Sequence, residues 1–495
     1  MNCAPPLKAI RLITTVVLAT IAVALVGTTI PAAAQDVVYD FPNVADDARY
    51  PGGALTQGRD GNLYGVSATD ESNTDGVIYM LTPAGIETGL HHFLHDGSEG
   101  TYCSSWTSGA WGLTLASDGN FYGTCEGGGT PSNACGGDYG CGTVYKITPD
   151  GTFTVLHSFL GAAASEGSDP TGPLTQGADG NLYGVTYYGG TDTTGTVYKI
   201  TPTGTLTTVH SFSHLDGNGI APEGALFLSS NGNFYGTATG GGSGGYGSVF
   251  KMTTKGKITV LHNFTGSATD GGTPTGGVIQ GADGSFYGAT YFGGASSEGT
   301  LFKVTTANKF TLLHSFNLAA DYGILPTEGV VQATDGNIYG VTTSYAGGGY
   351  ANNGSAFKFS TAKKGGGFSV LFDFSGAVYP LPDSPFLTHT NGLLYGSTYQ
   401  GGQYSLGLVY SSNQGLKPFV TLQTRSGKVG TSVNILGQGF TGATNVSFNG
   451  TSATFAVVSD TFMTATIPVG SKTGYVTVTE PGGKLQSNFK FTVKP

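Results

Sequence analysis

Asp60-Gly61-Asn62-Leu63-Tyr64-Gly65 is the stretch that decides the fold, because near-copies of it return six more times along the chain. The copies are spaced by 58, 61, 52, 52, 52 and 56 residues, and they begin at Asp118, Asp179, Asn231, Asp283, Asp335 and Asn391. Self-similarity at such a period is typical of repeat proteins that use one supersecondary unit per copy. We therefore expect a tandem array of small, similar units.

One copy, residues 172–212, contains four short β-type runs separated by Asp-Gly, Gly-Gly and Pro-Thr-Gly. This pattern predicts a four-stranded antiparallel meander. The second and third runs are apolar or aromatic on both alternating sets of positions, so both faces of the sheet need a cover. In a tandem array the neighbouring copy supplies that cover, and four-stranded sheets packed face to face around an axis form a β-propeller.

The number of strands of each type predicts the number of sheets. The second and third runs each occur seven times, whereas the fourth run occurs six times after a complete set of inner runs. The seventh fourth-type run is Val37-Val38-Tyr39-Asp40-Phe41, at the other end of the array. We therefore predict an all-β fold in which residues 35–415 form a seven-bladed β-propeller, closed by pairing of residues 37–41 with the strand near Val409. An open β-solenoid is the alternative, and it predicts no displaced strand.

The full motif reads (Asp/Asn)-Gly-Asn-hydrophobic-Tyr-Gly-x-Thr, followed by Gly-Gly and Gly-Thr-Val-(Tyr/Phe)-Lys. It resembles the GloVer-type (Gloeo/Verruco) tandem repeat of bacterial exported proteins. The resemblance covers roughly residues 36–412. It implies no agreed activity that could be assigned to particular residues.

After Gly415 the repeat pattern stops, and short strand-like runs alternate with glycine turns through residues 416–495. A segment of this size with about seven such runs predicts a small β-sandwich, whose last strand we place at residues 489–491. Gly437-Gln438-Gly439-Phe440, Val446-Ser447-Phe448-Asn449-Gly450 and the closing Pro481-Gly482-Gly483 resemble an IPT/TIG domain of immunoglobulin-like fold. That resemblance implies a spacer or an adhesive module.

Residues 1–34 have the pattern of a secretory signal peptide. Lys8 and Arg11 precede an apolar run from residue 12 to residue 27, and small residues follow at 31–34. The alternative is an uncleaved anchor, for which the run is short. Removing the two basic residues would change the formal charge from −10 to −12. We expect a secreted, periplasmic or cell-surface protein with no membrane span after cleavage and no nucleic-acid partner.

Four cysteines remain within 39 residues of the mature chain, which predicts a local disulfide framework in an exported protein: Cys103, Cys125, Cys135 and Cys141. Three pairings are possible, and we favour Cys103 with Cys125 and Cys135 with Cys141. A four-thiolate zinc site is the alternative, but the sequence has no Cys-x-x-Cys spacing. We therefore expect no metal and no cofactor.

Two rows of rings recur within the copies, and we interpret both as packing elements. The second strand always carries a tyrosine, whose buried hydroxyl will need a hydrogen-bond partner. The fourth strand carries a histidine in five copies, at His91, His157, His210, His262 and His314. Metal or proton chemistry is the alternative for the histidines. Tyr39 and Phe372 fill the same position in other copies, which favours packing. We likewise interpret the repeated Asp-Gly as turn geometry rather than as a metal or sugar site.

The connections between the second and third strands, and between successive copies, vary in length and sequence and should emerge at one face. We predict that this face recognises a ligand. Its candidate binding residues are Tyr187, Tyr188, Tyr246, Tyr291, Phe292, Tyr345 and Tyr399, and carboxylates such as Asp169, Asp270 and Asp321 lie in the same loops. Exposed rings beside carboxylates suit a sugar, which offers an apolar face and hydroxyl groups. The alternative is that these rings only pack the loops.

These observations predict an exported, non-enzymatic binding or adhesion protein, a monomer whose partner is a glycan or another surface protein. One alternative is a secreted polysaccharide hydrolase or lyase that uses two carboxylates at the same face, with Glu223 and Glu328 as candidates. The other is a structural surface-layer component. The sequence contains no nucleophile elbow, phosphate loop or zinc-protease motif.

Overall fold

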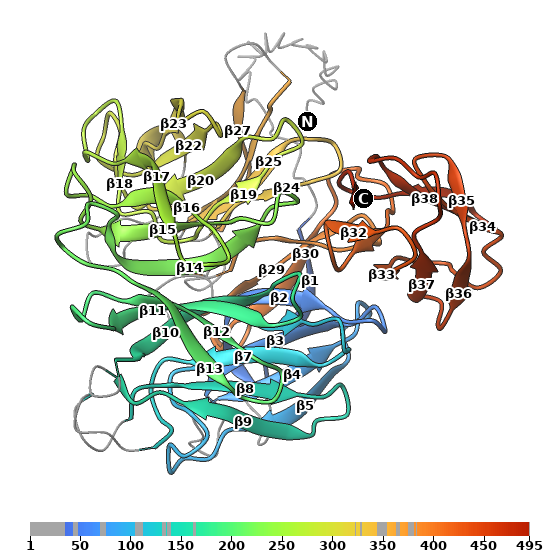
Figure 1. The fold of residues 1–495 in the computed structure, drawn as a ribbon, viewed down its shortest axis with the longest axis horizontal. Coiled ribbons are helices and arrows are strands. Elements are labelled where there is room, and N and C mark those ends of the chain that lie inside the picture. The colour runs from blue at the N-terminus through green and yellow to red at the C-terminus, as the bar shows by residue number, and fades with distance from the viewer. Residues whose placement is uncertain are drawn as a thin grey trace, which may run out of the picture.

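The computed structural model describes most of residues 35–494. The described residues are 35–42, 48–69, 76–103, 112–130, 135, 140–161, 165–321, 323–326, 329–343, 354–362, 367–374, 381–382 and 384–494. The predicted signal peptide, residues 1–34, lies outside this part. Apart from one short helix, α1 (Leu318–Asp321), the described regular structure is β-strand (Figure 1).

Residues 35–412 form seven four-stranded antiparallel sheets within the described part of the chain. We number these sheets 1 to 7 along the chain. Sheets 1 to 3 contain β2 (Arg49–Gln57), β3 (Leu63–Thr69), β4 (Val77–Leu81) and β5 (Glu87–His92); β6 (Thr114–Leu115), β7 (Phe121–Cys125), β8 (Thr143–Ile147) and β9 (Phe153–Ser158); and β10 (Gly167–Gln176), β11 (Leu182–Gly189), β12 (Thr196–Ile200) and β13 (Leu206–Ser211).

Sheets 4 to 7 repeat this order with one change in the last sheet. They contain β14 (Ile220–Leu228), β15 (Phe234–Gly240), β16 (Ser248–Met252) and β17 (Ile258–Asn263); β19 (Ile279–Gln280), β20 (Phe286–Thr290), β22 (Thr300–Val304) and β23 (Phe310–Ser315); β24 (Val331–Gln332), β25 (Ile338–Thr342), β26 (Ser355–Phe359) and β27 (Phe368–Asp373); and β28 (Leu387–Thr388), β29 (Leu394–Thr398), β30 (Leu408–Ser412) and β1 (Gln35–Asp40). Sheet 5 is extended by a small pair, β18 (Gly271–Gly272) with β21 (Phe292–Gly293).

The repeated Asp-Gly-Asn-x-Tyr-Gly stretch forms a turn that satisfies its own polar groups. In sheet 3, the Asp179 carboxylate accepts hydrogen bonds from the Asn181 amide and from the Tyr183 hydroxyl, the latter at 3.0 Å. The tyrosine of every sheet bonds the Asp or Asn four residues before it. The turn residue is therefore the partner that the sequence analysis required for the buried hydroxyl.

The glycine after this tyrosine is fixed by packing rather than by backbone conformation. A Cβ on Gly184 would overlap the ring of Tyr198, which comes from the third strand of the same sheet. The equivalent glycine meets a third-strand Tyr or Phe ring in all seven sheets. The Tyr-Gly pair therefore leaves the space that the neighbouring strand fills with an aromatic ring.

Successive sheets are joined by a repeated contact at the start of the first strand. In five sheets a non-glycine residue with φ between +52° and +57° precedes a proline, at Tyr50, Asp169, Ala221, Thr273 and Leu325. The N–H of each donates to a carbonyl of the preceding sheet, at 2.7 to 3.0 Å. The proline packs on the glycine that starts the third strand there, as Pro222 does on Gly195. These bonds stabilise a conformation that is otherwise uncommon for non-glycine residues.

Sheet 7 makes these same contacts with sheet 1, so the series of sheets closes on itself. Tyr50 N–H donates to the Leu406 carbonyl at 2.7 Å, and Pro51 packs on Gly407. The N-terminal strand β1 pairs with β30, with Tyr39 opposite Val409. The predicted pairing of residues 37–41 with the strand near Val409 is confirmed. We call the contacts between sheets 7 and 1 the closing seam.

Residues 416–494 form a separate set of short strands, which we call the C-terminal region. Its two four-stranded sheets are β31 (Thr421–Leu422), β33 (Ser432–Leu436), β37 (Phe462–Thr466) and β36 (Phe455–Val457), and β35 (Thr451–Ala453), β34 (Asn445–Phe448), β38 (Val476–Glu480) and β39 (Gly483–Gln486); a parallel pair, β32 (Ser426–Lys428) with β40 (Thr492–Lys494), completes it. One core cluster contains residues of both sheets. The last strand is residues 492–494, three residues beyond the segment expected from the sequence, because Thr492 N–H bonds the Arg425 carbonyl and starts the parallel pair there.

The C-terminal region packs against the Asp-Gly turns of sheets 1, 2 and 7 and against sheet 4. Figure 1 shows it as a separate group of strands at one side of the seven sheets. Two arginine–phenylalanine contacts run in opposite directions across this interface. Arg59 of sheet 1 lies 4.4 Å from the ring centre of Phe462, and Arg425 of the C-terminal region lies 4.7 Å from that of Phe227 in sheet 4. Such cation–π contacts stabilise most when they are removed from water. The Asp-Gly turns are therefore partly covered.

Candidate functional site

The sheets have two chemically different ends. We call the end with the Asp-Gly turns the turn end. The opposite end, where the second strand connects to the third and each sheet connects to the next, is the loop end. Because the strands are antiparallel, all the variable connections predicted from the sequence emerge together at the loop end. The candidate binding residues belong to these connections.

Large aromatic side chains are exposed at the loop end of three successive sheets. The exposed fractions are 51% for Tyr188 in sheet 3, 48% for Tyr246 in sheet 4 and 46% for Phe292 beside sheet 5. The three rings belong to equivalent connections of neighbouring sheets, so they lie on one face of the molecule. Tyr404, at the loop end of sheet 7, is also exposed.

Glycines position the rings of sheets 4 and 5. Phe292 of β21 pairs with Gly272 of β18. Side-chain atoms of Tyr246 border the positions that a Cβ on Gly272 or on Gly266 would occupy. Tyr246 and Phe292 therefore both lie next to Gly272. Because Gly266 and Gly272 have no side chain, the tyrosine ring can lie over their backbone.

Sheets 3 and 5 each carry a pair of adjacent aromatic residues at equivalent positions. Tyr187 and Tyr188 have ring centres 4.7 Å apart at 79°, and Tyr291 and Phe292 have ring centres 4.5 Å apart at 86°. In each pair the first ring is half-buried and the second is exposed. The first ring therefore supports the second in an edge-to-face contact.

The buried carboxyl group of Glu223 lies near Tyr187. Glu223 is 4% exposed and belongs to β14 of sheet 4. Burial raises the pKa of Tyr187, and the Glu223 carboxylate raises it further. Tyr187 is therefore neutral at physiological pH and able to donate a hydrogen bond. Glu328, the other catalytic candidate, lies outside the described residues, so no pair with Glu223 can be measured.

Tyr399 occupies the loop end of the closing seam. Its ring stacks on Tyr50 of sheet 1, with ring centres 5.2 Å apart and 29° between the planes. Both rings are half-buried. Tyr399 therefore contributes to contact between sheets as well as to the surface. Tyr345, the remaining aromatic candidate, lies outside the described residues.

Sheets 2 and 3 place two carboxyl groups together at the loop end. Glu126 follows β7, at the position that Tyr187 occupies in sheet 3, and Asp169 is the left-handed residue before Pro170. Burial raises the pKa of Glu126 to about 7, and the Asp169 carboxylate adds to the shift. Burial also raises the pKa of Asp169 to about 6. Within the described part of the chain, neither carboxyl group has a hydrogen-bond or ion-pair partner. Both therefore keep their protons at pH values well above those at which carboxyl groups usually ionise.

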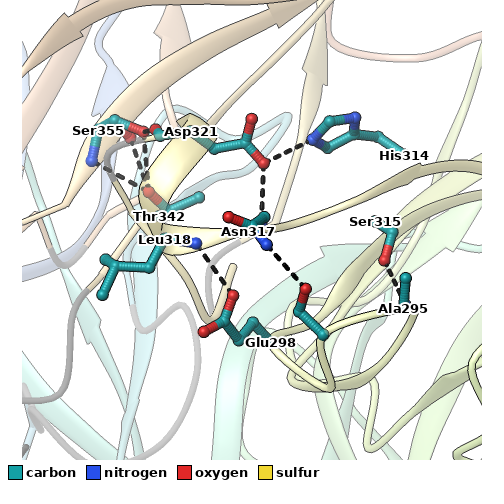
Figure 2. A network of polar contacts seen from close by, with 10 residues as sticks. Ala295, Glu298, His314, Ser315, Asn317, Leu318, Asp321, Thr342 and Ser355 are labelled. Atoms are coloured by element: carbon teal, nitrogen blue, oxygen red, sulfur yellow. Dashed lines mark hydrogen bonds and ion pairs between the residues drawn. The ribbon is translucent and has the colours of Figure 1, made fainter.

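Four of the five repeated histidines of the fourth strands bond a carboxylate of the loop that follows, and the fifth lies near one. His91, His157, His262 and His314 contact Glu99, Glu166, Asp270 and Asp321 at 2.8 to 3.1 Å, and His210 lies 4.0 Å from Asp216. Figure 2 shows the sheet 5 example, in which Asp321 also accepts the Asn317 N–H at 2.9 Å. Three of the five histidine rings stack on a phenylalanine of the next sheet, as His314 does on Phe368 with ring centres 3.7 Å apart. These histidines pack the sheets together and hold the loops.

The cysteines pair as favoured from the sequence, Cys103 with Cys125 and Cys135 with Cys141. Disulfides of this kind are typical of proteins that fold in an oxidising extracellular or periplasmic compartment. Among the residues described, no three His, Cys, Asp or Glu side chains are grouped to hold a metal ion. No described helix is long and apolar enough to cross a membrane.

A protein-family model for the Gloeobacter/Verrucomicrobia repeat matches residues 113–357 and 221–457. The chain belongs to this repeat family. The matches continue past residue 415, and no comparison supports the IPT/TIG resemblance of residues 416–495. A search of curated protein sequences found no match.

Solved structures similar to this repeat protein share little sequence with it. A fungal alcohol oxidase of the AA5 family, in complex with copper, is 13% identical with a TM-score of 0.49, over 92% of this chain and 98% of the oxidase. The periplasmic gluconolactonase of Pseudomonas aeruginosa is 16% identical with a TM-score of 0.42, over 73% of this chain and 95% of the lactonase. Both are propeller-like. Similarity at this level says nothing about the activity of the repeat protein.

Sequence reasoning missed two features of the repeat protein's loop end. The histidines and the carboxylates were treated as two separate sets, although a carboxylate follows the histidine by six to nine residues in all five copies that carry one. The recurrence of a carboxylate within this short interval was the available signal. Glu126 was not singled out. Aligning the copies at their Tyr-Gly pairs would have shown that Glu126 occupies the position equivalent to Tyr187.

Proposed function

We propose that this is an exported, non-enzymatic binding or adhesion protein that recognises a glycan at its loop end. In this proposal residues 1–34 are the signal peptide and residues 35–415 form a seven-bladed β-propeller. Residues 416–495 form an immunoglobulin-like domain. The seven sheets, the pairing of β1 with β30 and the two face-to-face sheets of the C-terminal region support this arrangement.

The exposure of Tyr188, Tyr246 and Phe292 on three successive sheets carries the proposal. A pyranose ring offers an apolar face that stacks on an aromatic ring, and its hydroxyls bond polar groups nearby. Sheets 3 and 5 hold their exposed rings against a second ring, so little side-chain freedom remains to be lost on binding. The net negative charge of the chain favours neutral or cationic glycans over polyanions.

A glycan array probed with the full mature protein tests this proposal. Tyr188→Ala and Phe292→Ala should each weaken binding to the retained glycans by about tenfold, which corresponds to about 1.4 kcal/mol. Ile86→Ala is the matched control, because Ile86 is an exposed apolar residue beside the turn end. Retention of no glycan, or equal retention by all variants, would remove glycan recognition at this face.

A polysaccharide hydrolase is the second candidate, and the Glu126–Asp169 pair is the observation that favours it. A general acid for glycoside cleavage must hold its proton near neutral pH, and burial raises the pKa of Glu126 to about 7. Incubation with plant and bacterial polysaccharides should then release reducing ends, and Glu126→Gln should abolish the release. Release that Glu126→Gln leaves intact would exclude this pair as the catalytic groups.

A further inference from the structure

The turn end of the closing seam contains a buried histidine that belongs to none of the five repeated histidine–carboxylate pairs. His389 lies just after β28 of sheet 7 and is 1% exposed. Its Nε2 lies 3.0 Å from the Gly61 carbonyl of sheet 1. Its Nδ1 accepts the Asn391 N–H at 3.2 Å. The imidazole therefore joins the last sheet to the first.

The C-terminal region covers this same point. Thr390, the neighbour of His389, contacts sheet 1 through Gln57, whose Nε2 lies 2.8 Å from the threonine Oγ1. The same Oγ1 accepts a hydrogen bond from Gln438 at 2.9 Å and contacts the Gly437 carbonyl at 3.3 Å. The first sheet, the last sheet and the C-terminal region thus meet at one threonine.

Only the neutral form of His389 satisfies both of its neighbours. A neutral ring with its proton on Nε2 donates to the Gly61 carbonyl and accepts at Nδ1. A second proton, on Nδ1, would face the Asn391 N–H, which is also a donor. Burial lowers the pKa of His389 below its usual 6.5, and the bonds to Gly61 and Asn391 only partly offset this.

No carboxylate contacts the imidazole in the described part of the chain. The charged residues on the surrounding segments are Arg59 and Asp60 on the sheet 1 turn, Lys417 on the connecting segment and Asp460 in the C-terminal region. Asp60 is occupied by Asn62 and Tyr64. Asp460 accepts N–H groups of residues 439 and 441. The Tyr395 ring, 5.3 Å away, supplies an apolar contact.

The loop end of the same seam carries the Tyr50–Tyr399 stack. Both rings are attached to the strands that His389 and Gly61 join at the turn end. A change in the spacing of sheets 7 and 1 at one end would therefore displace the rings at the other.

We propose that the C-terminal region holds the closing seam shut and that protonation of His389 opens it in mild acid. The open form accepts a proton that the closed form excludes, so acidification favours opening below pH 6.5 and has no effect well above it. This inference concerns the fold alone and does not depend on glycan recognition.

Hydrogen exchange of the full mature protein tests the proposal without a ligand. After correction for intrinsic rates, peptides covering residues 57–64 and 387–396 should exchange about tenfold faster at pH 5.5 than at pH 7.5. The corresponding turn peptides of sheets 3 to 6 should not change. In His389→Gln the difference between the two pH values should vanish, because a glutamine amide can donate to Gly61 and does not titrate.

Two further variants separate the parts of the proposal. His214→Gln, at an exposed histidine, should retain the wild-type pH effect. Gln438→Ala should accelerate exchange at the seam equally at both pH values, because it removes a contact of the C-terminal region and no titrating group. An unchanged pH effect in His389→Gln would overturn the role of the histidine. Unchanged seam protection in Gln438→Ala would overturn the role of the C-terminal region.

Discussion

The turn end and the loop end of the sheets are built from the same seven copies, yet they differ in how much variation they allow. At the turn end each second-strand tyrosine bonds the residue four positions before it, in all seven sheets. At the loop end, the position three residues after the Tyr-Gly glycine changes from sheet to sheet, as Ala68, Glu126, Tyr187, Thr239, Tyr291, Thr343 and Tyr399.

The difference follows from what each end must satisfy. At the turn end a buried hydroxyl, a tight turn and a ring from the next strand share one space, so one solution recurs. At the loop end the joint between sheets uses mainly backbone groups, a glycine and a proline. The neighbouring side chains are therefore free to differ, and they carry the aromatic rings and the carboxyl pair.

The largest expected effect tests the crowding near the turn end. Gly184→Ala places a methyl group against Tyr198 and Leu174, and we expect it to lower the free energy of unfolding by about 3 kcal/mol. Urea denaturation measures this. Gly180→Ala is the matched control, because its glycine has open space around it and a φ of +82°, so only the conformational cost of about 1 kcal/mol applies. Equal costs would show that crowding does not distinguish the two glycines.

The carboxyl pair of the loop end gives the next largest effect. Because the pKa of Glu126 is about 7 in the folded protein and its usual value is 4.5, the folded state holds a proton that the unfolded state has released between these values. The contribution of Glu126 to the free energy of unfolding is therefore fully present below pH 4.5. It is lost as the pH rises from 4.5 through 7. We expect a loss of about 2 kcal/mol from pH 5 to pH 8, after allowance for solvent screening.

Glu126→Gln should remove most of this pH dependence, as measured by urea midpoints at the two pH values. Asp169→Asn should reduce it as well, because it removes both a titrating group and the neighbour that raises the pKa of Glu126. If Glu126→Gln loses as much stability between pH 5 and pH 8 as the wild-type protein does, other groups must cause the effect.

Removing one hydroxyl from the turn end should have a smaller effect. Tyr183→Phe deletes the bond to Asp179, which keeps its Asn181 donors, so we expect a loss of about 1 kcal/mol. Tyr198→Phe is the matched control. The Tyr198 hydroxyl is buried without a partner in the described part of the structure, and its removal should be neutral or stabilising. A larger loss in Tyr198→Phe would contradict the hydrogen-bond account.

Much of the sheet array could be predicted from the sequence because its determinants are local and repeated. The Asp-Gly turn, the Tyr-Gly pair and the Gly-Thr-Val strand each appear seven times in some form. The fourth strand that the last copy lacks could therefore be recognised at residues 37–41, at the other end of the array. The left-handed residues before proline were not, because Tyr50, Asp169 and Leu325 share no side-chain chemistry. Their conformation depends on a carbonyl of another copy.

The candidate site was predicted less completely than the sheets. The aromatic rings could be assigned to one end from topology alone, but their exposure depends on neighbours such as Gly266 and Gly272 that lie outside their own segment. Burial raises the pKa of Glu126, and Asp169, 43 residues away in the next sheet, raises it further. Which residues of neighbouring copies lie close together depends on how the sheets pack. It cannot be predicted from the sequence of a single copy.

The smallest expected effect separates recognition from packing at the loop end. Tyr188 is half-exposed and rests edge-on against Tyr187, so Tyr188→Ala should change the free energy of unfolding by no more than about 0.5 kcal/mol, in contrast to the turn-end variants. Thermal and urea unfolding of the variant measure this directly. A loss above about 1 kcal/mol would mean that the ring is needed to pack its loop, and its exposure would then no longer indicate a binding surface.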